Sequence, residues 1–319
     1  MTSPSLDGHL GTKGSARRPQ CVSTLGPKRG WALLLALVQR LRADGPIEGP
    51  IGVGLDRDDH YVELPPTQAS LVIDPSAERG WTSSDENIMP DATVQLFDLF
   101  VPLCVGPQAS DLVVAHLAQS LDGRVATASG SSQFISGRED LTHTHRLRAL
   151  FDAVLVGART VEHDDPRLTT RLAPGPNPTR VIVDPSGRLP TTHRVFTQAD
   201  APTLLVRGPG AFEVPSHVDV MRLELHDGWI AAPALLAGLA ERGLRRVFIE
   251  GGGITVSGFL DAGVLDRLHI TVAPVLMGSG RPSLSLPEIA TLDEAMRVSC
   301  RHFALGPDVL FDCPLPRSR

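Results

Sequence analysis

Residues 247–260, VFIEGGGITVSGFL, carry the pattern most suggestive of ligand chemistry in this sequence. An apolar run ends at Glu250, three glycines follow, and a helical pattern then begins. A turn that opens a helix presents free backbone N–H groups and the positive end of a helix dipole, which suit a phosphate group. Glu250 would lie at the carboxyl end of its strand, where α/β sheets bind ligands. A tight turn without a ligand explains the glycines equally well, so this pattern alone leaves both interpretations open.

Two further groups of polar residues also follow predicted strands or precede predicted helices. The first is 120–124, SLDGR, and the second is 160–171, TVEHDDPRLTTR, which contains the carboxylate of Asp164. Arg148 and Arg171 flank these groups, and arginine can bind a phosphate through two parallel N–H bonds. The three groups together suggest a site for a small anionic ligand.

The elements that would position these residues alternate between strands and helices from residue 111 onward. Strands are expected at 112–118, 153–156, 180–183, 203–206, 220–225, 246–249 and 268–273. Helices are expected at 138–150, 231–242 and 256–262, with a short helical segment ending at 160 and a closing hairpin of 300–305 with 309–312. This order predicts an α/β fold with a mixed central sheet and helices on both faces.

The front third of the chain has a different character. Residues 1–29 are rich in Ser, Gly, Pro, Lys and Arg without periodicity, so we expect a disordered leader. Residues 30–110 would form a small appended region of unknown function, with a helix at 31–43 and an apolar run at 94–105 that periodicity assigns to neither helix nor strand. Residues 111–319 would form the main domain.

Composition narrows the possible partners. The chain has 319 residues, is 42% hydrophobic and carries a net charge of -6, which argues against a nucleic-acid or membrane partner. Its longest apolar run is too short to span a bilayer. The four cysteines are widely spaced, so we expect reduced thiols, a cytoplasmic location and no metal site.

Two histidine-containing segments could be mistaken for metal sites. His143 and His145 are two residues apart on a predicted helix and would point in different directions, so we expect surface histidines. Residues 56–60, DRDDH, lack the spacing of a calcium loop and are expected to form a solvated turn.

Several motifs, taken in order, resemble a known family. They are 116–128 (HLAQSLDGRVATA), 129–136 (SGSSQFIS), 145–150 (HRLRAL), 156–171 and 247–260. Together they resemble the reductase domain of riboflavin biosynthesis, 5-amino-6-(5-phosphoribosylamino)uracil reductase, which has the dihydrofolate-reductase fold. The resemblance covers roughly residues 110–313. It implies a homodimer and hydride transfer from NADPH to C1′ of the opened ribosylamino sugar, which gives a ribitylamino side chain.

The resemblance also implies roles for individual residues. The substrate and its phosphate would contact Ser132, Arg148, Leu168, Arg171 and Glu250. The cofactor would contact Ala118, Phe134, Thr160, Asp164, Gly252, Gly253, Ile254, Thr255, Val256, Ser257 and Gly258. Asp164, Glu250 and His116 would be the catalytic side chains, and the residue that moves the proton stays open.

The chain departs from the family in three ways. His116 stands where the family usually has lysine, and Phe134 stands where tryptophan is common. Residues 1–110 lack the H-x-E and P-C-x-x-C motifs of the zinc deaminase that bifunctional members carry. His116 could still be a proton donor or a substrate ligand. It could also mark a reductase of another aminopyrimidine or pterin, or a nucleotide-binding protein without turnover.

Overall fold

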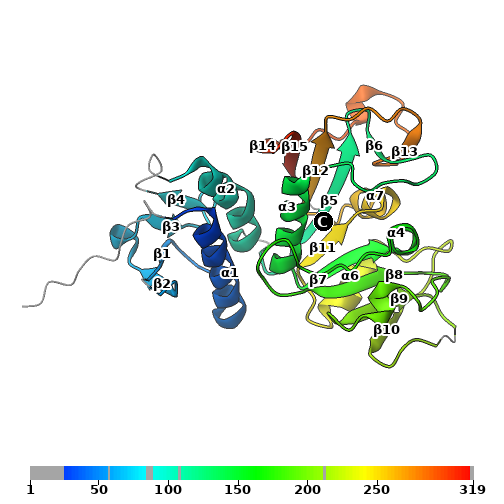
Figure 1. Ribbon diagram of the computed structural model, residues 1–319, viewed down its shortest axis with the longest axis horizontal. Helices are drawn as coiled ribbons and strands as arrows, with labels where there is room; N and C mark the ends of the chain where they lie inside the picture. The colour runs from blue at the N-terminus through cyan, green and yellow to red at the C-terminus, as the bar shows by residue number, and fades with distance from the viewer. Residues whose placement is uncertain (1–24, 57, 84–88, 107–108, 211–212, 317–319) are drawn as a thin grey trace, which may run out of the picture.

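The computed structural model describes residues 25–316 except 57, 84–88, 107–108 and 211–212. Its larger part is built on a nine-stranded sheet with strand order β10-β9-β8-β7-β11-β5-β12-β15-β14 (Figure 1). The strands are β5 (Val113–Ser120), β7 (Ala153–Gly157), β8 (Thr179–Val183), β9 (Thr203–Arg207), β10 (Val218–Arg222), β11 (Val247–Glu250), β12 (Arg267–Ala273), β14 (Arg301–Leu305) and β15 (Asp308–Pro314). From β10 to β12 in this order, neighbouring strands pair in parallel. Strand β15 pairs antiparallel with β12, and β14 pairs antiparallel with β15. The predicted mixed sheet is confirmed.

Helices cover both faces of this sheet, because its buried strands are apolar on both sides. The helices are α3 (Arg138–Leu150), α4 (Ala158–Asp164), α5 (Arg194–Thr197), α6 (Ala232–Ala240) and α7 (Gly253–Asp261). On β5, Val113 and Ala115 share a buried cluster with residues of α6 and α7. Val114 belongs to the cluster on the other face, with residues of α3, α4 and α5. Successive side chains of β5 point to opposite faces of the sheet and therefore belong to two different hydrophobic cores.

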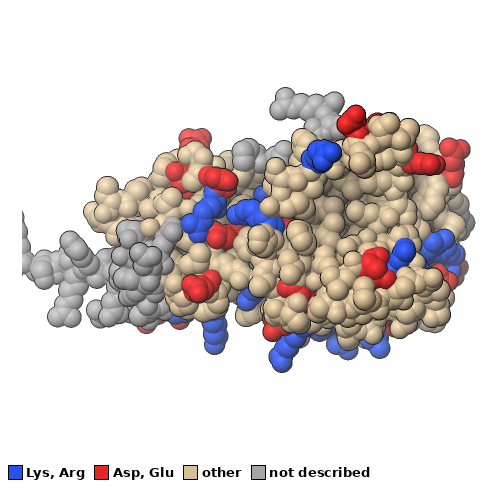
Figure 2. All heavy atoms as spheres, turned by 90° about the horizontal axis from the view of Figure 1, so that it is seen from above, with Lys and Arg blue, Asp and Glu red and all other residues tan. Residues whose placement is uncertain are grey.

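A short two-stranded sheet, β6 (Arg124–Thr127) with β13 (Gly280–Pro282), extends beyond the end of β5. None of the helices in the described part of the chain is long and apolar enough to cross a bilayer. On the face in Figure 2, acidic and basic side chains are interspersed, and neither sign forms a continuous patch.

The N-terminal region is a small α/β unit. Helices α1 (Pro27–Asp44) and α2 (Asp91–Val105) cover a four-stranded antiparallel sheet with order β2-β1-β3-β4. Its strands are β1 (Ile51–Leu55), β2 (Tyr61–Leu64), β3 (Leu71–Ile73) and β4 (Trp81–Ser83), with a 3-10 turn at Pro66–Gln68. The expected leader lies largely outside the described residues, but α1 begins at Pro27, so the expectation of disorder up to residue 29 was wrong. Pro27 at the start of the helix explains that boundary.

Helices α1 and α2 pack against α3 (Figure 1). The Trp31 indole N–H donates to the carbonyl of Pro174 at 2.8 Å, and the rings of Phe100 and His143 lie 5.3 Å apart. Helix α3 is therefore covered by the sheet on one side and by the N-terminal helices on the other. His143 is buried as a result, and His145 is buried where it accepts the backbone N–H groups of Arg171 and Leu172, so the expected surface position of both was wrong.

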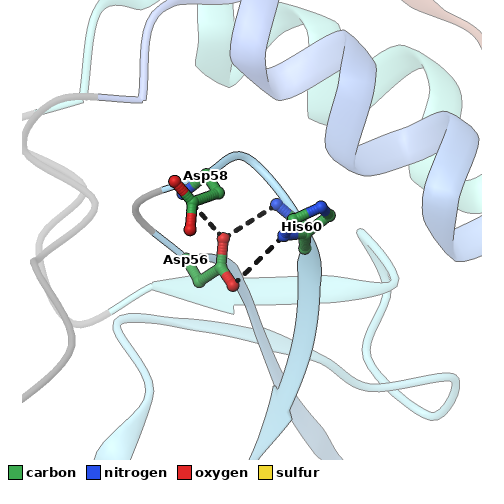
Figure 3. Close-up of side chains that lie close together, drawn as sticks. All are labelled: Asp56, Asp58 and His60. Carbon is green, nitrogen blue, oxygen red and sulfur yellow. Dashed lines mark hydrogen bonds and ion pairs between the residues drawn. The ribbon is translucent and has the colours of Figure 1, made fainter.

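The loop between β1 and β2 brings Asp56, Asp58 and His60 together at the surface, within 4.8 Å of one another through possible ligand atoms (Figure 3). The Asp56 carboxylate accepts the backbone N–H groups of Asp58 and His60, each at 2.9 Å. These bonds close the turn and hold the pKa of Asp56 below its usual range, chiefly through the His60 N–H. The Asp56 carboxylate thus stabilises the turn, and the surface position of this turn agrees with the solvated turn expected from the sequence.

Candidate active site

A cleft of about 1430 Å³ opens at the carboxyl ends of the central parallel strands. Residues of β5 and β11, the start of α4, the start of α7 and the inner face of α3 line it. Carboxyl ends of parallel strands meet at one edge of a sheet, so motifs distant in sequence converge there. Most of the residues implied by the family resemblance lie on its wall: His116, Ala118, Ser132, Phe134, Arg148, Thr160, Asp164, Leu168, Arg171, Glu250, Gly252, Gly253, Ile254, Thr255 and Gly258.

The glycine turn approaches the cleft in a conformation that favours glycine. Gly251 and Gly252 have φ values of 70° and 74°. A Cβ on Gly252 would lie 3.0 Å from the Thr160 hydroxyl, and one on Gly253 would lie 2.3 Å from the Ser283 carbonyl oxygen. Gly252 precedes the first turn of α7 and has no side chain with which to cap it. The turn can therefore present backbone N–H groups to a phosphate, which fits a dinucleotide cofactor.

Two of the expected cofactor contacts do not face the cleft. Val256 is fully buried in the core shared with β5 and α6. The Ser257 hydroxyl accepts the backbone N–H of Ser285 at 2.8 Å. The helical repeat turns these two side chains inward, away from the cleft.

Asp164 reaches the cleft from the end of α4. Its carboxylate accepts the Ser132 hydroxyl at 2.9 Å, which joins two segments predicted to bind different ligands. Asp165 follows with φ 40° and ends the helix. Leu168 also has positive φ, 56°, and is a buried residue of the cleft wall.

Glu250 and Arg148 form a bidentate ion pair across the cleft wall. The Arg148 Nε donates to one carboxylate oxygen at 2.7 Å, and Nη2 donates to the other. Its Nη1 donates to the Thr169 carbonyl at 2.8 Å. Arg148 side-chain exposure is 7%, so this pair is largely shielded from water. Arg148 thereby fixes both oxygens of Glu250 at the cleft wall.

Further arginines lie near this pair. Burial lowers the pKa of Arg171, and the positive charges of Arg148 and Arg167 lower it further. The Arg171 backbone N–H donates to His145 Nδ1 at 2.7 Å. Burial, followed by the charges of Arg148 and Arg171, lowers the pKa of His145 to about 4, so His145 stays a neutral acceptor. A cluster of arginines in this state favours an anion.

His116 lies at the inner end of the cleft and is 4% exposed. Its Nε2 is 3.1 Å from Asp140 Oδ1 and 3.2 Å from the Thr271 hydroxyl. Burial acts to raise the pKa of Asp140, but the charge of His116 and hydrogen bonding to it outweigh burial and hold that pKa well below its usual range. His116 therefore faces an ionised carboxylate.

The first of the three polar groups does not reach the cleft. The Asp122 carboxylate accepts the Ser120 hydroxyl at 2.5 Å and the backbone N–H groups of Met277 and Gly278. These bonds lower the pKa of Asp122 to about 2. The motif at 120–124 therefore closes a turn against the 277–278 loop.

Several wall residues were missed by sequence reasoning, notably Asp140, Thr144, Arg188 and Trp229. Asp140, Thr144 and Arg148 are spaced by four residues on α3 and so share one face, which was a signal available in the sequence. Thr271 contacts His116 from a strand 155 residues away. Nothing local in the sequence indicates that contact.

Comparison with known proteins agrees with this geometry. The RibD C-terminal domain family matches residues 111–311. A 2,5-diamino-6-ribosylamino-4(3H)-pyrimidinone 5′-phosphate reductase of Methanothermobacter thermautotrophicus is 36% identical over 217 residues, which cover 63% of this chain and 96% of the relative. Riboflavin biosynthesis protein RibD of Aquifex aeolicus is 35% identical over 64% of this chain but only 57% of its own length.

A solved structure shows the same domain. The diaminohydroxyphosphoribosylaminopyrimidine deaminase/5-amino-6-(5-phosphoribosylamino)uracil reductase of Thermotoga maritima superposes with a TM-score of 0.57 at 28% identity, over 71% of this chain and 62% of that chain. The family match covers more than half of the sequence, and the archaeal relative is matched over nearly its whole length. The chain belongs to the RibD C-terminal domain family of pyrimidine reductases.

Proposed function

We propose that this protein reduces the ribosyl side chain of a 5-phosphoribosylaminopyrimidine to the ribitylamino form, with NADPH as the hydride donor, in riboflavin biosynthesis. The observation that carries the proposal is one cleft with a glycine turn at a helix start on one wall and an arginine cluster on another. The first suits the cofactor phosphates and the second suits the substrate phosphate. The bound nicotinamide supplies the hydride.

The chain's own side chains would orient the substrate and manage its charge. Arg171 and Arg148 would hold the sugar phosphate, assisted by Ser132 and the backbone at Leu168. Glu250, fixed by Arg148, would contact the substrate beside the reacting carbon. Asp164 would lie between cofactor and substrate, where its bond to Ser132 couples the two subsites. His116 would supply positive charge or a proton at the inner end of the cleft.

The pyrimidine is proposed as 5-amino-6-(5-phosphoribosylamino)uracil. The similarity to the Methanothermobacter reductase favours a second candidate, the 2,5-diaminopyrimidinone, in which an amino group replaces one carbonyl oxygen of the uracil. Both candidates undergo the same reduction at the sugar. Assays with each compound, following the loss of NADPH absorbance, separate them by kcat/KM. A rate with either that falls at least about 100-fold in Arg171→Ala and Asp164→Ala supports the site, whereas no rate with both compounds contradicts the function.

Arg188 supports the choice of NADPH over NADH. It lines the cleft beside Pro185 and Ser186, its side chain is 44% exposed, and its partner Glu162 is 3.5 Å away. An arginine at this position can bind the 2′-phosphate that distinguishes NADPH. We expect Arg188→Ala to raise KM for NADPH about 10-fold and to leave KM for NADH nearly unchanged. Arg188→Lys should retain part of the preference, and an equal rise for both cofactors would contradict this role.

We also propose a cytoplasmic homodimer. The described cysteines Cys104, Cys300 and Cys313 are free thiols, which supports a reducing compartment. Strand β14 is an edge of the sheet, and Val309 and Phe311 on β15 are more than a third exposed. Apolar side chains next to a sheet edge support association with a second copy. Sedimentation equilibrium should give twice the chain mass, and Phe311→Glu should give the single-chain mass. A wild-type monomer at micromolar concentration would contradict the proposal.

A further inference from the structure

The N-terminal unit (residues 25–105) contacts the larger part of the molecule both far from the cleft and close to it. Far from the cleft, Arg42 on α1 donates at 2.9 Å to the carboxylate of Asp152, which precedes β7 at the opposite edge of the sheet. Close to the cleft, Trp31 on α1 contacts the loop at 165–178, which joins α4 to β8. None of the described residues of the unit lines the cleft itself. An effect of the unit on a ligand must therefore pass through a contact such as that of Trp31.

The 165–178 loop contains neither helix nor strand, and its inner edge is attached to α3. Arg148 Nη1 donates to the carbonyl of Thr169 at 2.8 Å, and the backbone N–H of Arg171 donates to His145 Nδ1 at 2.7 Å. The proposed function assigns the substrate phosphate to Arg171 in this loop. A segment without regular structure depends on such contacts for its position. The position of Arg171 therefore depends on how the loop is held.

The outer edge of the same loop is attached to α1. The indole N–H of Trp31 donates to the carbonyl of Pro174 at 2.8 Å. Trp31 is 3% exposed and an indole has a single donor, so this carbonyl is the acceptor that satisfies a buried N–H. At the next residue, a Cβ added to Gly175 would lie 2.5 Å from the Ala149 Cβ on α3 and 3.4 Å from Leu35 Cδ2 on α1. The loop is thus packed between the two helices.

The Trp31 side chain is itself held by its neighbours. Its ring packs edge-on against Phe100 of α2, with the ring centroids 5.4 Å apart. On α3, the guanidinium of Arg146 lies 5.5 Å from the centroid of the same ring. Rotation of the indole would break both contacts, so they fix the direction of its N–H bond. The N-terminal unit therefore determines where Pro174 lies.

We propose that the N-terminal unit is a positioning element for the substrate: through Trp31 it holds the 165–178 loop in the conformation in which Arg171 can bind the sugar phosphate. The inference rests on the proposed reductase function, which places the phosphate at Arg171. Trp31 does not touch the substrate. It acts through the short backbone segment from Pro174 back to Arg171, whose other end is held by His145.

Trp31→Phe removes the N–H donor and keeps an aromatic ring in the core. Without that bond the loop should sample positions in which Arg171 does not meet the phosphate. The KM of the phosphoribosylaminopyrimidine should then rise about 3- to 10-fold. We expect kcat and the Kd of NADPH to stay within about twofold of wild type, since a loss of uniform substrate binding changes KM alone. The kcat/KM of the same substrate without its 5′-phosphate should not change.

Trp81→Phe is the matched control within the same unit. Trp81 is 1% exposed, and its indole N–H donates to the Asp98 carboxylate at 3.1 Å, so the substitution removes the same atoms and the same kind of bond. Both variants should lower the midpoint of thermal unfolding, but only Trp31→Phe should raise KM. An unchanged KM in folded Trp31→Phe, or an equal rise in both variants, would show that the unit contributes stability alone and would overturn the inference.

A second substitution keeps the test decisive if Trp31→Phe fails to fold. Gly175→Ala leaves the core of the N-terminal unit intact, but its φ of 142° and the close approach to Ala149 force the loop away from both helices. KM for the phosphorylated substrate should rise by at least a similar factor. Wild-type KM in Gly175→Ala would contradict the proposed link between the position of the loop and phosphate binding.

A double-mutant cycle locates the effect. Because Trp31 acts through Arg171, Trp31→Phe in the Arg171→Ala background should change KM by less than about twofold. The same fold-change in both backgrounds would show that Trp31 acts elsewhere.

Binding of ribose 5-phosphate, measured by calorimetry, separates this inference from the proposed function because it needs no turnover. Arg171→Ala and Trp31→Phe should both weaken that binding, and Trp81→Phe should not. If both weaken it in a protein without turnover, the reductase assignment fails and the positioning role stands. If only Arg171→Ala weakens it, the positioning role fails alone. If Arg171→Ala leaves it unchanged, the phosphate lies elsewhere and the inference fails with that assignment.

Discussion

Glu250→Gln is expected to lower kcat by about 100- to 1000-fold, with the affinity for NADPH unchanged. Glu250 ends β11 at the cleft, and both of its oxygens accept from Arg148. A glutamine can accept only through its one carbonyl oxygen, so the variant loses a charge at the reacting centre and one half of the bidentate pair.

Steady-state kinetics and fluorescence titration of NADPH measure the two parts of this prediction. Glu241→Gln is a suitable control, because Glu241 is exposed at the end of α6 and lies outside the cleft. Thermal melts of both variants establish that the assays report folded protein. A rise in KM with kcat within about twofold of wild type would show uniform substrate binding instead of a catalytic role.

Gly252→Ala is expected to raise the Kd for NADPH at least about 10-fold. The positive φ of 74° penalises an added Cβ, which would also lie 3.0 Å from the Thr160 hydroxyl. Relief of that contact requires the turn or Thr160 to move, and both line the cleft. Misplaced backbone N–H groups would then lose their bonds to the cofactor phosphate.

Gly243→Ala separates this local effect from general strain. Gly243 has a similar φ of 76°, nothing lies within 4 Å of its added Cβ, and it is not part of the cleft. Both variants should lose about 1 kcal/mol of stability, but only Gly252→Ala should lose cofactor affinity. Isothermal titration with NADPH measures the affinity of each variant, and thermal melts measure their stability. Wild-type affinity in Gly252→Ala would contradict the assignment of this turn to the cofactor.

The sequence predicted the elements that carry strong patterns. The apolar strands β7, β8 and β11 and the helix α6 lie within a few residues of their expected positions, because each buries apolar side chains. Helix α3 also has its expected bounds, although many of its buried side chains are polar. The run at 94–105 was undecided and proved to be part of α2, whose aromatic residues pack on Trp31 and Trp81. Strands β2, β4, β6 and β13 have only three or four residues and leave no periodicity to detect.

The candidate site was predictable where it depends on local geometry and unpredictable where it depends on packing. The glycine turn and the arginines could be identified, since their chemistry is visible in their residue types. His143 and His145 were expected at the surface because the sequence shows neither that α2 lies against His143 nor that the loop at 171–172 lies against His145. Asp140 gains its importance only from its place opposite His116, which the order of strands and helices determines.

The measurement that tests the central claim most directly follows the hydride itself. NADPH carrying deuterium at C4 of the nicotinamide, on one face or the other, is incubated with the phosphoribosylaminopyrimidine. Mass spectrometry and proton NMR of the product then locate the label. The proposed function predicts one deuterium at C1′ of a ribitylamino product from one of the two labelled cofactors. Tight binding of NADPH with no labelled product, or deuterium placed in the pyrimidine ring, would contradict it.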